Sequence, residues 1–346
     1  MKNTKAVFIG RSAADMTNIA DGSVGLVVTS PPYPMIEMWD NIFASQNENI
    51  TGALNDCPLQ AFELMHSELD KVWKEVNRVL IPGGIACINI GDATRTINGA
   101  FQLFDNHSRI SNSFKILGLQ NLPSILWRKQ TNAPNKFMGS GMLPPGAYVT
   151  LEHEYILIFR KGNKRNFSST EEKRNRQKSA FFWEERNLWF SDIWFDVKGV
   201  KQSTNVKSLR ARTAAFPFEL SYRLIQMFSV KFDLVLDPFV GTGTTLLAAL
   251  ASQRNSIGYE IDEKLNQLIY SNLKKSVETI NSFIGKRIKN HDEFIAIREI
   301  EKGKMKYFNS YHQCSVMTRQ EVDIEIVKME KCIAVKDDMF VTTYKY

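Results

Sequence analysis

The residues best suited to chemistry form the pentapeptide Thr29-Ser30-Pro31-Pro32-Tyr33, which follows the apolar run 24–28. That run predicts a short buried strand, and two prolines without N–H groups must end its hydrogen-bond ladder. A hydroxyl and an aromatic ring are thus held at the carboxyl end of a strand, the edge at which open α/β sheets bind ligands. We therefore expect a polar binding corner here, although a tyrosine that merely packs in the core is the alternative for Tyr33.

A second candidate is the stretch Asp237–Thr245 (DPFVGTGTT), which lies between an expected strand and an expected helix. Gly241 and Gly243 let the backbone approach a ligand, and the helix start offers free N–H groups. Leu246 stands where a dinucleotide loop has its third glycine, and no Gly-Lys-Ser/Thr follows. Glu260 ends the next strand, where a carboxylate can accept hydrogen bonds from ribose hydroxyls. The pattern favours a nucleoside without pyrophosphate; a tight glycine turn with Glu260 as a helix cap is the alternative.

The elements that position these motifs alternate along the chain, as in α/β proteins. Helices are expected at 11–21, 59–79, 217–228, 246–252 and from 261 to about 284. Apolar runs predict strands at 6–9, 24–28, 85–90, 124–129, 154–160, 232–236 and 257–260, and strand-like runs recur at 293–300, 322–327, 332–335 and 339–344. A length of 346 residues fits about two domains, or one large domain with insertions.

The net charge indicates what kind of partner the protein binds, and the cysteines indicate in which cellular compartment it works. A net charge of +7 and a pI near 9.1 favour a polyanionic partner, although a basic surface kept for solubility explains them as well. The four cysteines are far apart and form no CxxC pair, which argues against a zinc knuckle or a disulfide scaffold. No signal peptide or spanning helix is found, so a cytoplasmic location without membrane association is expected.

Together, TSPPY at 29–33 and DPFVGTGTT at 237–245 resemble the amino-group DNA methyltransferases that use S-adenosylmethionine. The catalytic motif precedes the cofactor motif, as in the β group, a circular permutation within that family. The resemblance implies an α/β, circularly permuted Rossmann-like fold with a seven-stranded mixed sheet, an inserted DNA-recognition region and a small β-rich C-terminal appendage. It places the catalytic core at 1–161 and 206–284, the target-recognition insertion at 162–205 and an appendage of unassigned role at 285–346.

Matched position by position, the resemblance also implies a set of site residues. The catalytic residues would be Ser30, Pro31, Pro32 and Tyr33, and no metal is implied. The S-adenosylmethionine-binding residues would be Asp237, Phe239, Gly241, Gly243, Thr244, Glu260, Phe216 and Pro217. Arg11 follows Gly10 of the first strand, where many relatives have Asp, so no adenine-ring contact is assigned there.

The chemistry of the corner follows from its hydrogen-bond acceptors. The exocyclic amine of a base is a poor nucleophile because its lone pair is delocalised into the ring. Ser30 Oγ and the Pro31 carbonyl can each accept one N–H bond, which favours the pyramidal amine needed for methyl transfer. Tyr33 can stack on a base flipped out of the duplex. Ser30 is not a strong base at neutral pH, and the sequence names no route for the departing proton.

The choice of base rests on one side chain. In this family Ser before Pro-Pro-Tyr resembles the cytosine-N4 enzymes, and Asp or Asn there resembles the adenine-N6 enzymes. The resemblance thus implies N4 methylation of cytosine in double-stranded DNA, as the protective half of a restriction–modification system with a companion endonuclease. Adenine-N6 methylation, and a DNA-binding regulator that holds S-adenosylmethionine without catalysis, are the alternatives.

Candidate DNA contacts lie in the basic, aperiodic stretch 161–178 of the implied recognition insertion. Lys164, Arg165, Arg174 and Arg176 could bind guanine edges or phosphates, and a solvated charged loop is the alternative. The appendage could add DNA contacts or mediate self-association, which leaves a homodimer open.

Overall fold

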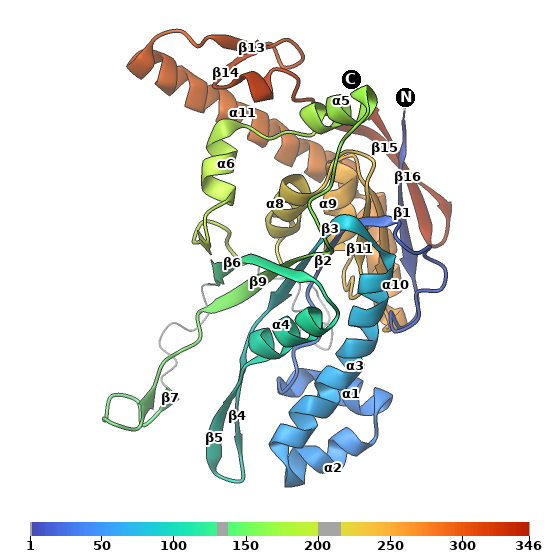
Figure 1. Cartoon of the computed structure of the whole chain (residues 1–346), viewed down its shortest axis with the longest axis vertical. Helices are drawn as coiled ribbons and strands as arrows, with labels where there is room; N and C mark the ends of the chain where they lie inside the picture. Colours follow the sequence, from blue (N-terminus) through green and yellow to red (C-terminus); the bar gives the residue numbers. More distant parts are fainter. Residues whose placement is uncertain (1, 130–137, 200–215, 346) are drawn as a thin grey trace.

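A ten-stranded sheet runs through the molecule, and the computed structural model describes it within residues 2–129, 138–199 and 216–345 (Figure 1). From edge to edge the strands are β10 (Ile193–Trp194), β6 (Gln120–Arg128), β9 (His153–Arg160), β3 (Leu80–Ile90), β2 (Val24–Thr29), β11 (Leu234–Asp237), β12 (Asn255–Tyr259), β1 (Thr4–Ile9), β16 (Met339–Lys345) and β15 (Lys328–Lys336). The run from β6 to β1 is the seven-stranded mixed sheet that the sequence predicts. β10 adds a strand beside β6 at one edge of this sheet, and the β15–β16 hairpin adds two strands beside β1 at the other.

Strand direction decides which residues meet at each edge of the sheet. β3, β2, β11, β12 and β1 are mutually parallel, so their carboxyl ends share one edge. β9 is antiparallel to both β3 and β6, so the chain that follows β9 emerges at the opposite edge. The N-terminal strand β1 lies beside β12, which comes from the C-terminal third of the chain, as the permuted order requires.

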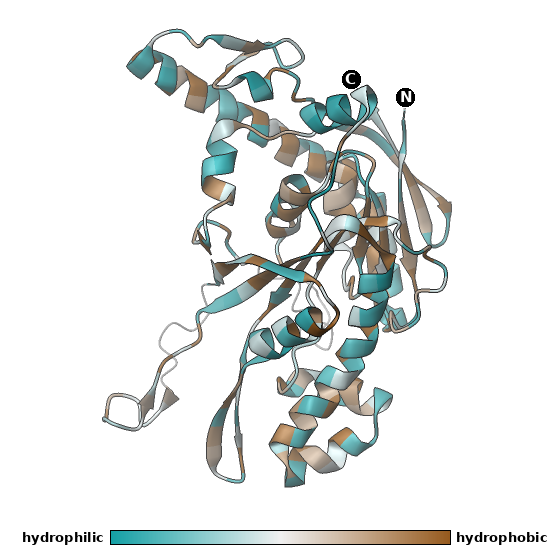
Figure 2. Ribbon diagram, viewed as in Figure 1, coloured by the Kyte–Doolittle hydropathy of each residue, from teal (hydrophilic) through white to brown (hydrophobic). Residues whose placement is uncertain are grey.

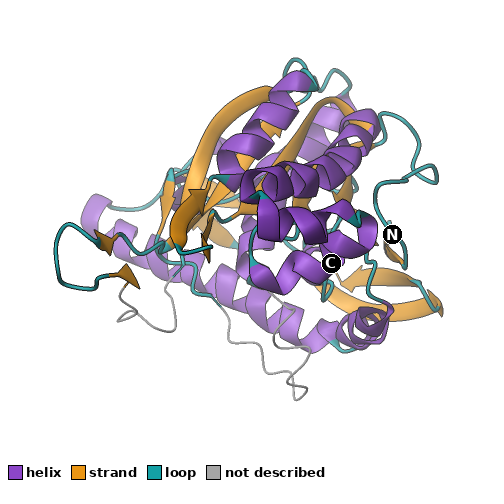
Figure 3. Ribbon diagram, turned by 90° about the horizontal axis from the view of Figure 1, so that it is seen from below, coloured by secondary structure: helices purple, strands orange, loops and turns teal. Residues whose placement is uncertain are grey.

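Alternate side chains of the central strands form two cores, one on each face of the sheet. Leu26 and Val28 of β2 pack on the side of α8 (Phe218–Phe228), α9 (Thr244–Ala251) and α11 (Ser276–Lys302). Val24 and Val27 pack on the side of α3 (Pro58–Val79) and α4 (Asn106–Ile116). Helices therefore cover both faces (Figure 3), and hydrophobic residues concentrate along the strands between them (Figure 2). Within the described part of the chain, no helix is both long and apolar enough to cross a membrane.

Several segments extend from the carboxyl edge of the parallel strands. The 3₁₀ turn η1 (Glu37–Trp39), α1 (Asp40–Gln46) and α2 (Asn49–Asp56) follow β2 and lead into α3. Two hairpins project beside them, β4 (Ala93–Ile97) with β5 (Ala100–Phe104) and β7 (Met138–Gly139) with β8 (Ala147–Tyr148) (Figure 1). The rings of Phe101 and Tyr148 stack with centroids 4.3 Å apart, which joins the two hairpins.

The C-terminal region differs from the prediction. Residues 293–300 are not a strand but part of α11, and the segment 322–327 lies between the 3₁₀ turn η2 (Arg319–Glu321) and β15. The two later runs are strands, and β16 pairs with β1, so this part of the region is continuous with the central sheet. The small hairpin β13 (Tyr307–Asn309) with β14 (Cys314–Val316) follows α11 in sequence and folds back over it (Figure 1), with the Ser315 carbonyl 3.1 Å from His291 Nε2. The sequence predicts one helix from residue 261 to about 284, whereas the structure has two there: α10 (Glu263–Lys274) and the start of α11.

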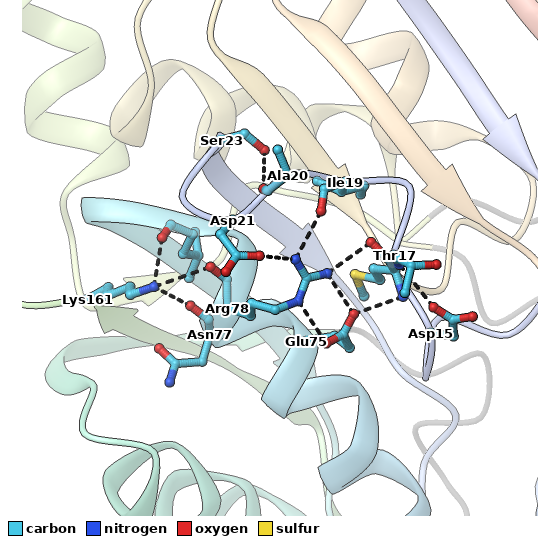
Figure 4. Close-up of polar contacts among 12 residues, drawn as sticks. Asp15, Thr17, Ile19, Ala20, Asp21, Ser23, Glu75, Asn77, Arg78 and Lys161 are labelled. Carbon is cyan, nitrogen blue, oxygen red and sulfur yellow. Dashed lines mark hydrogen bonds and ion pairs between the residues drawn. The ribbon is translucent and has the colours of Figure 1, made fainter.

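Residues 11–21, predicted as a helix, instead form turns, and Figure 4 shows why. The guanidinium of Arg78, near the end of α3, donates to the carbonyls of Ile19 (3.0 Å) and Met16 (2.9 Å). Glu75 pairs with Arg78 at 2.7 Å and accepts the N–H of Met16 at 2.9 Å. These bonds satisfy backbone groups that a helix would pair internally, so the segment is held open as a loop against α3.

Replacing Arg78 tests this anchor. Arg78→Ala removes a charged donor from two backbone carbonyls and from Glu75, so we expect the free energy of unfolding to fall by about 2–3 kcal/mol. Urea denaturation followed by circular dichroism measures the loss. Lys289→Ala, which breaks an exposed i,i+4 pair with Glu293, is the control and should cost less than about 0.5 kcal/mol. Equal effects of the two variants would contradict an anchoring role.

Candidate active site

The two sequence motifs meet at neighbouring strand ends. β2 pairs with β11 through Leu26 with Val235 and Val27 with Leu236, which brings Thr29 beside Asp237. Thr29 Oγ1 donates to Asp237 Oδ1 at 2.5 Å across a sequence separation of 208 residues.

The Asp237 carboxylate is a buried link rather than an open ligand group. Thr245 Oγ1 donates to Oδ2 at 2.6 Å, and the Phe239 N–H donates to Oδ1 at 3.0 Å. Asp237 is 2% exposed, and burial raises its pKa to about 6 although the three donors act to lower it. Its hydrogen bonds tie the end of β2, the glycine loop and the start of α9 together.

The glycine loop joins β11 to α9, the strand–loop–helix order that the sequence predicts. Gly241 has a φ of 53° and Gly243 a φ of 87°, both in the left-handed region that favours glycine. The Gly241 N–H donates to Glu260 Oε2 at 2.9 Å, and the Asp262 N–H donates to Glu260 Oε1 at 2.8 Å. Burial raises the pKa of Glu260 to about 7. Each carboxylate oxygen keeps a further acceptor position for a ligand hydroxyl.

A pocket opens where these strands end, and most of the predicted residues line it. They are Ser30, Pro31, Pro32, Phe216, Asp237, Phe239, Gly241, Thr244 and Glu260. Gly243 and Pro217 are the N-cap residues of α9 and α8, so they shape the two helix starts behind the lining. Buried carboxylate, backbone and aromatic groups in one pocket suit a ligand with both a hydroxylated and an apolar part.

Other lining residues come from segments that carry no motif. They are Arg11, Ser12 and Ala13 from the loop that Arg78 anchors, Trp39, Ile42, Phe43 and Gln46 from η1 and α1, and Glu68, Leu69 and Val72 from α3. The long insertion after TSPPY is a signal for the second group, because segments of that length at a ligand-binding edge are often functional. The sequence assigns no ligand contact to Arg11. Its position shows that the loop after β1 forms part of the pocket wall.

A polar network lies beside the pocket around Tyr33. Ser30 Oγ donates to Tyr33 Oη at 3.2 Å, and Tyr33 Oη donates to Glu154 Oε2 at 2.9 Å. Asn89 Nδ2 contacts both acceptors, at 2.9 Å and 2.7 Å, and Lys129 Nζ lies 2.7 Å from Glu154 Oε1. Burial, followed by the charge of Glu154, raises the pKa of Tyr33 well above its usual value. The hydroxyl of Tyr33 is therefore fixed and protonated.

The basic residues of the predicted insertion lie elsewhere. Arg165 pairs with Asp233, just before β11, at 2.6 Å. The guanidinium groups of Arg165 and Arg176 both lie over the ring of Phe167, 4.9 and 5.0 Å from its centroid. Lys164 and Arg174 are exposed. Arg174 and Arg176 belong to the helix α5 (Thr170–Lys178), although the sequence predicts an irregular stretch there. All four follow β9 and therefore lie toward the amino ends of the parallel strands, away from Ser30. The part of the insertion at 200–205 lies outside the described residues.

Comparisons with known proteins identify the family. A model of N6/N4 methyltransferases, described as DNA methylase, matches residues 24–271. The chain belongs to this family of DNA methyltransferases. It is 51% identical to the Type II methyltransferase M.MthZI of Methanothermobacter thermautotrophicus, over 100% of this chain and 96% of that protein. M.MjaI of Methanocaldococcus jannaschii, also a Type II methyltransferase, is 53% identical over 77% of this chain and 90% of its own length.

Solved structures of similar proteins agree with the methyltransferase fold. TTHA0409 of Thermus thermophilus, solved in complex with S-adenosyl-L-methionine, is 33% identical with a TM-score of 0.60, over 77% of this chain and 93% of its own. The PvuII DNA methyltransferase, a cytosine-N4-specific enzyme, has a TM-score of 0.52 at 17% identity, over 83% and 93% of the two chains. At that identity the second likeness concerns the fold alone.

Proposed function

We propose that this DNA methyltransferase transfers a methyl group from S-adenosyl-L-methionine to the N4 amine of a cytosine flipped out of double-stranded DNA. The observation that carries the proposal is that Ser30, with a neutral hydroxyl, lines the same pocket as the glycine loop and Glu260. An adenine-N6 methyltransferase is the alternative, because the family includes enzymes of both kinds.

The pocket fits S-adenosyl-L-methionine, which supplies an electrophilic methyl group on sulfur when it is bound. Glu260 offers the two carboxylate oxygens that ribose hydroxyls need, and both are already oriented by backbone N–H groups. Phe216, Phe239 and Trp39 supply apolar walls for the adenine and methionine parts. Asp237 is 2% exposed and accepts three hydrogen bonds from within the protein, so we assign to it the part of holding the loop at the pocket wall.

The corner fits an exocyclic amine. Ser30 donates its own proton to Tyr33, which leaves the Ser30 oxygen free to accept an N–H bond from the base. The Pro31 carbonyl is the second acceptor that we assign to the amine. We assign the stacking contact with the flipped base to the ring of Tyr33, whose hydroxyl is held by Ser30, Asn89 and Glu154. These contacts position and polarise the amine, which is what direct transfer needs most.

Methyl transfer to DNA tests the proposal directly. Duplex DNA incubated with the protein and labelled S-adenosyl-L-methionine is digested to nucleosides, and we expect N4-methylcytosine. Ser30→Ala should lower the rate at least about 100-fold, because the amine loses an oriented acceptor. Ser45→Ala, which removes a hydroxyl that donates to the Ile42 carbonyl of its own helix, is the control. N6-methyladenine would overturn the choice of base, and binding of both ligands without transfer would favour a non-catalytic regulator.

The pKa of Glu260 predicts how cofactor affinity depends on pH. Above about pH 7 its carboxylate is ionised and accepts from the ribose, whereas below that pH the protonated acid loses acceptor capacity. Affinity for S-adenosyl-L-methionine should therefore weaken as the pH falls from 8 to 6. Titration calorimetry at several pH values measures this, and Glu260→Gln should bind weakly with no such slope. A wild-type affinity that is flat across this range would contradict the role of Glu260.

The edge that carries Ser30 is where we place the DNA. The hairpins β4–β5 and β7–β8 extend from that edge, and Arg95 of β4 is held there by Asp40. Lys164 and Arg174 are exposed at the opposite edge, so they would reach only DNA that leaves the target site.

A double variant separates the two edges. Lys164→Ala with Arg174→Ala should leave the DNA affinity and the methylation rate within about twofold of wild type, because both side chains lie far from the flipped base. Gel-shift titration with a short duplex measures the affinity. A large loss of DNA affinity would contradict this placement and would support the prediction from the sequence that the basic insertion recognises DNA.

Two further partners belong to the proposal. The relatives M.MthZI and M.MjaI are Type II methyltransferases, which supports a companion restriction endonuclease that cuts the same site when it is unmodified. A homodimer stays a prediction, which sedimentation of the purified protein would test.

A further inference from the structure

Glu154 is a nearly buried acid beside the catalytic corner that carries no sequence motif. It is 8% exposed and lies near the start of β9. The antiparallel register pairs Ile90 of β3 with Tyr155, so Glu154 lies just past the end of β3, at the edge that carries Ser30. A Cβ on Gly91 would come within 3.4 Å of Glu154 Cγ and 3.0 Å of the Tyr33 ring, so glycine leaves room for the two side chains to meet.

The hydrogen bonds from Ser30 to Glu154 all run in one direction. Ser30 donates to Tyr33 at 3.2 Å, and Tyr33 donates to Glu154 at 2.9 Å. The first bond is long, as catalytic hydrogen bonds often are before substrate binds. This series of hydrogen bonds ends on the carboxylate of Glu154. Asn89 Nδ2 donates to its Oε2 and Lys129 Nζ donates to its Oε1, each at 2.7 Å, and these two bonds hold the carboxylate in place. A row of hydroxyls that ends on a fixed carboxylate is a path along which a proton can move.

The surroundings of Tyr33 suit relay rather than charge storage. Burial and the negative charge of Glu154 raise the pKa of Tyr33, so a tyrosinate would be costly and the hydroxyl stays neutral. A neutral hydroxyl can accept one proton while it gives up its own. The negative charge stays on Glu154, where Lys129 compensates it.

We propose that Glu154 receives the proton released by methyl transfer, through Ser30 and Tyr33. The inference rests on the proposed function and names the proton route for that same site. As the new N–C bond forms and the carbon–sulfur bond breaks, sulfur keeps the bonding electrons and the amine gains a positive charge. The amine proton passes to Ser30 Oγ, the Ser30 proton to Tyr33 Oη and the Tyr33 proton to Glu154 Oε2. The charges balance: amine and sulfide end neutral, and the carboxylate becomes a carboxylic acid.

Glu154 acts through Tyr33 and does not touch the base, so it is a positioning residue whose ionisation matters. Glu154→Gln keeps the shape and an acceptor for Tyr33 but cannot take up the proton. We expect its single-turnover rate to fall about 100-fold, within the usual range for losing general-base assistance. The dissociation constants for S-adenosyl-L-methionine and DNA should stay within about twofold of wild type.

Further variants separate relay from packing. Tyr33→Phe keeps the stacking ring but breaks the path, so it should lose about as much rate as Glu154→Gln, and the double variant should lose little more. Glu154→Asp, with its carboxylate one methylene shorter, should recover part of the rate. The control is Glu152→Gln. Glu152 lies two residues before Glu154, its partly exposed side chain pairs with Arg128, and the variant should match wild type.

The outcomes distinguish the relay from the proposed function. A wild-type rate in Glu154→Gln or in Tyr33→Phe would overturn the relay while leaving the proposed function intact. A loss confined to the dissociation constants would also overturn it, because the network would then be structural. The relay is tested on whichever base the wild type methylates. Absence of transfer by the wild type would overturn the proposed function and the relay with it.

Discussion

One buried carboxylate holds the two halves of the site together. Asp237 accepts hydrogen bonds from Thr29 at the end of the catalytic strand, from Thr245 at the start of α9 and from the Phe239 N–H of the glycine loop. Unpaired polar groups are costly in an interior, so these bonds reinforce one another and allow little rearrangement. Because Ser30 directly follows Thr29, the proposed amine acceptor and the glycine loop keep a fixed separation. A reaction between two bound molecules needs that kind of positioning more than it needs a strong acid or base.

Local pattern predicted those parts of the fold whose partners are close in sequence or whose chemistry is unusual. The helical period of α3 and the proline-terminated strand β2 are of this kind, and both are where the sequence places them. Residues 11–21 are not a helix because Arg78, some 60 positions away, satisfies their carbonyls. Glu154 and Asn89 look like ordinary strand residues, since their role depends on the register between β3 and β9. Period and composition do not determine such tertiary contacts.

The basic insertion shows a related limit. Its charge is visible in the sequence, but its position depends on the direction of the strand before it. β9 runs antiparallel to both β3 and β6, so it delivers residues 161–178 to the amino ends of the parallel strands. The hairpins that do extend beside Ser30, β4–β5 and β7–β8, carry little charge and no motif. Composition indicates a partner class, whereas topology decides which surface can meet it.

The pairing of β2 with β11 also has a consequence for a chain still being made on the ribosome. Thr29 and Asp237 are 208 residues apart, so at ~5–20 residues per second about 10–40 s pass between their synthesis. During that time β2 can pair with at most one of its two sheet neighbours, β3, and the glycine loop does not yet exist. A nascent chain that ends before the glycine loop therefore lacks the Thr29–Asp237 contact and one wall of the pocket. Modification activity would begin only when the last third of the protein has emerged and folded against the first.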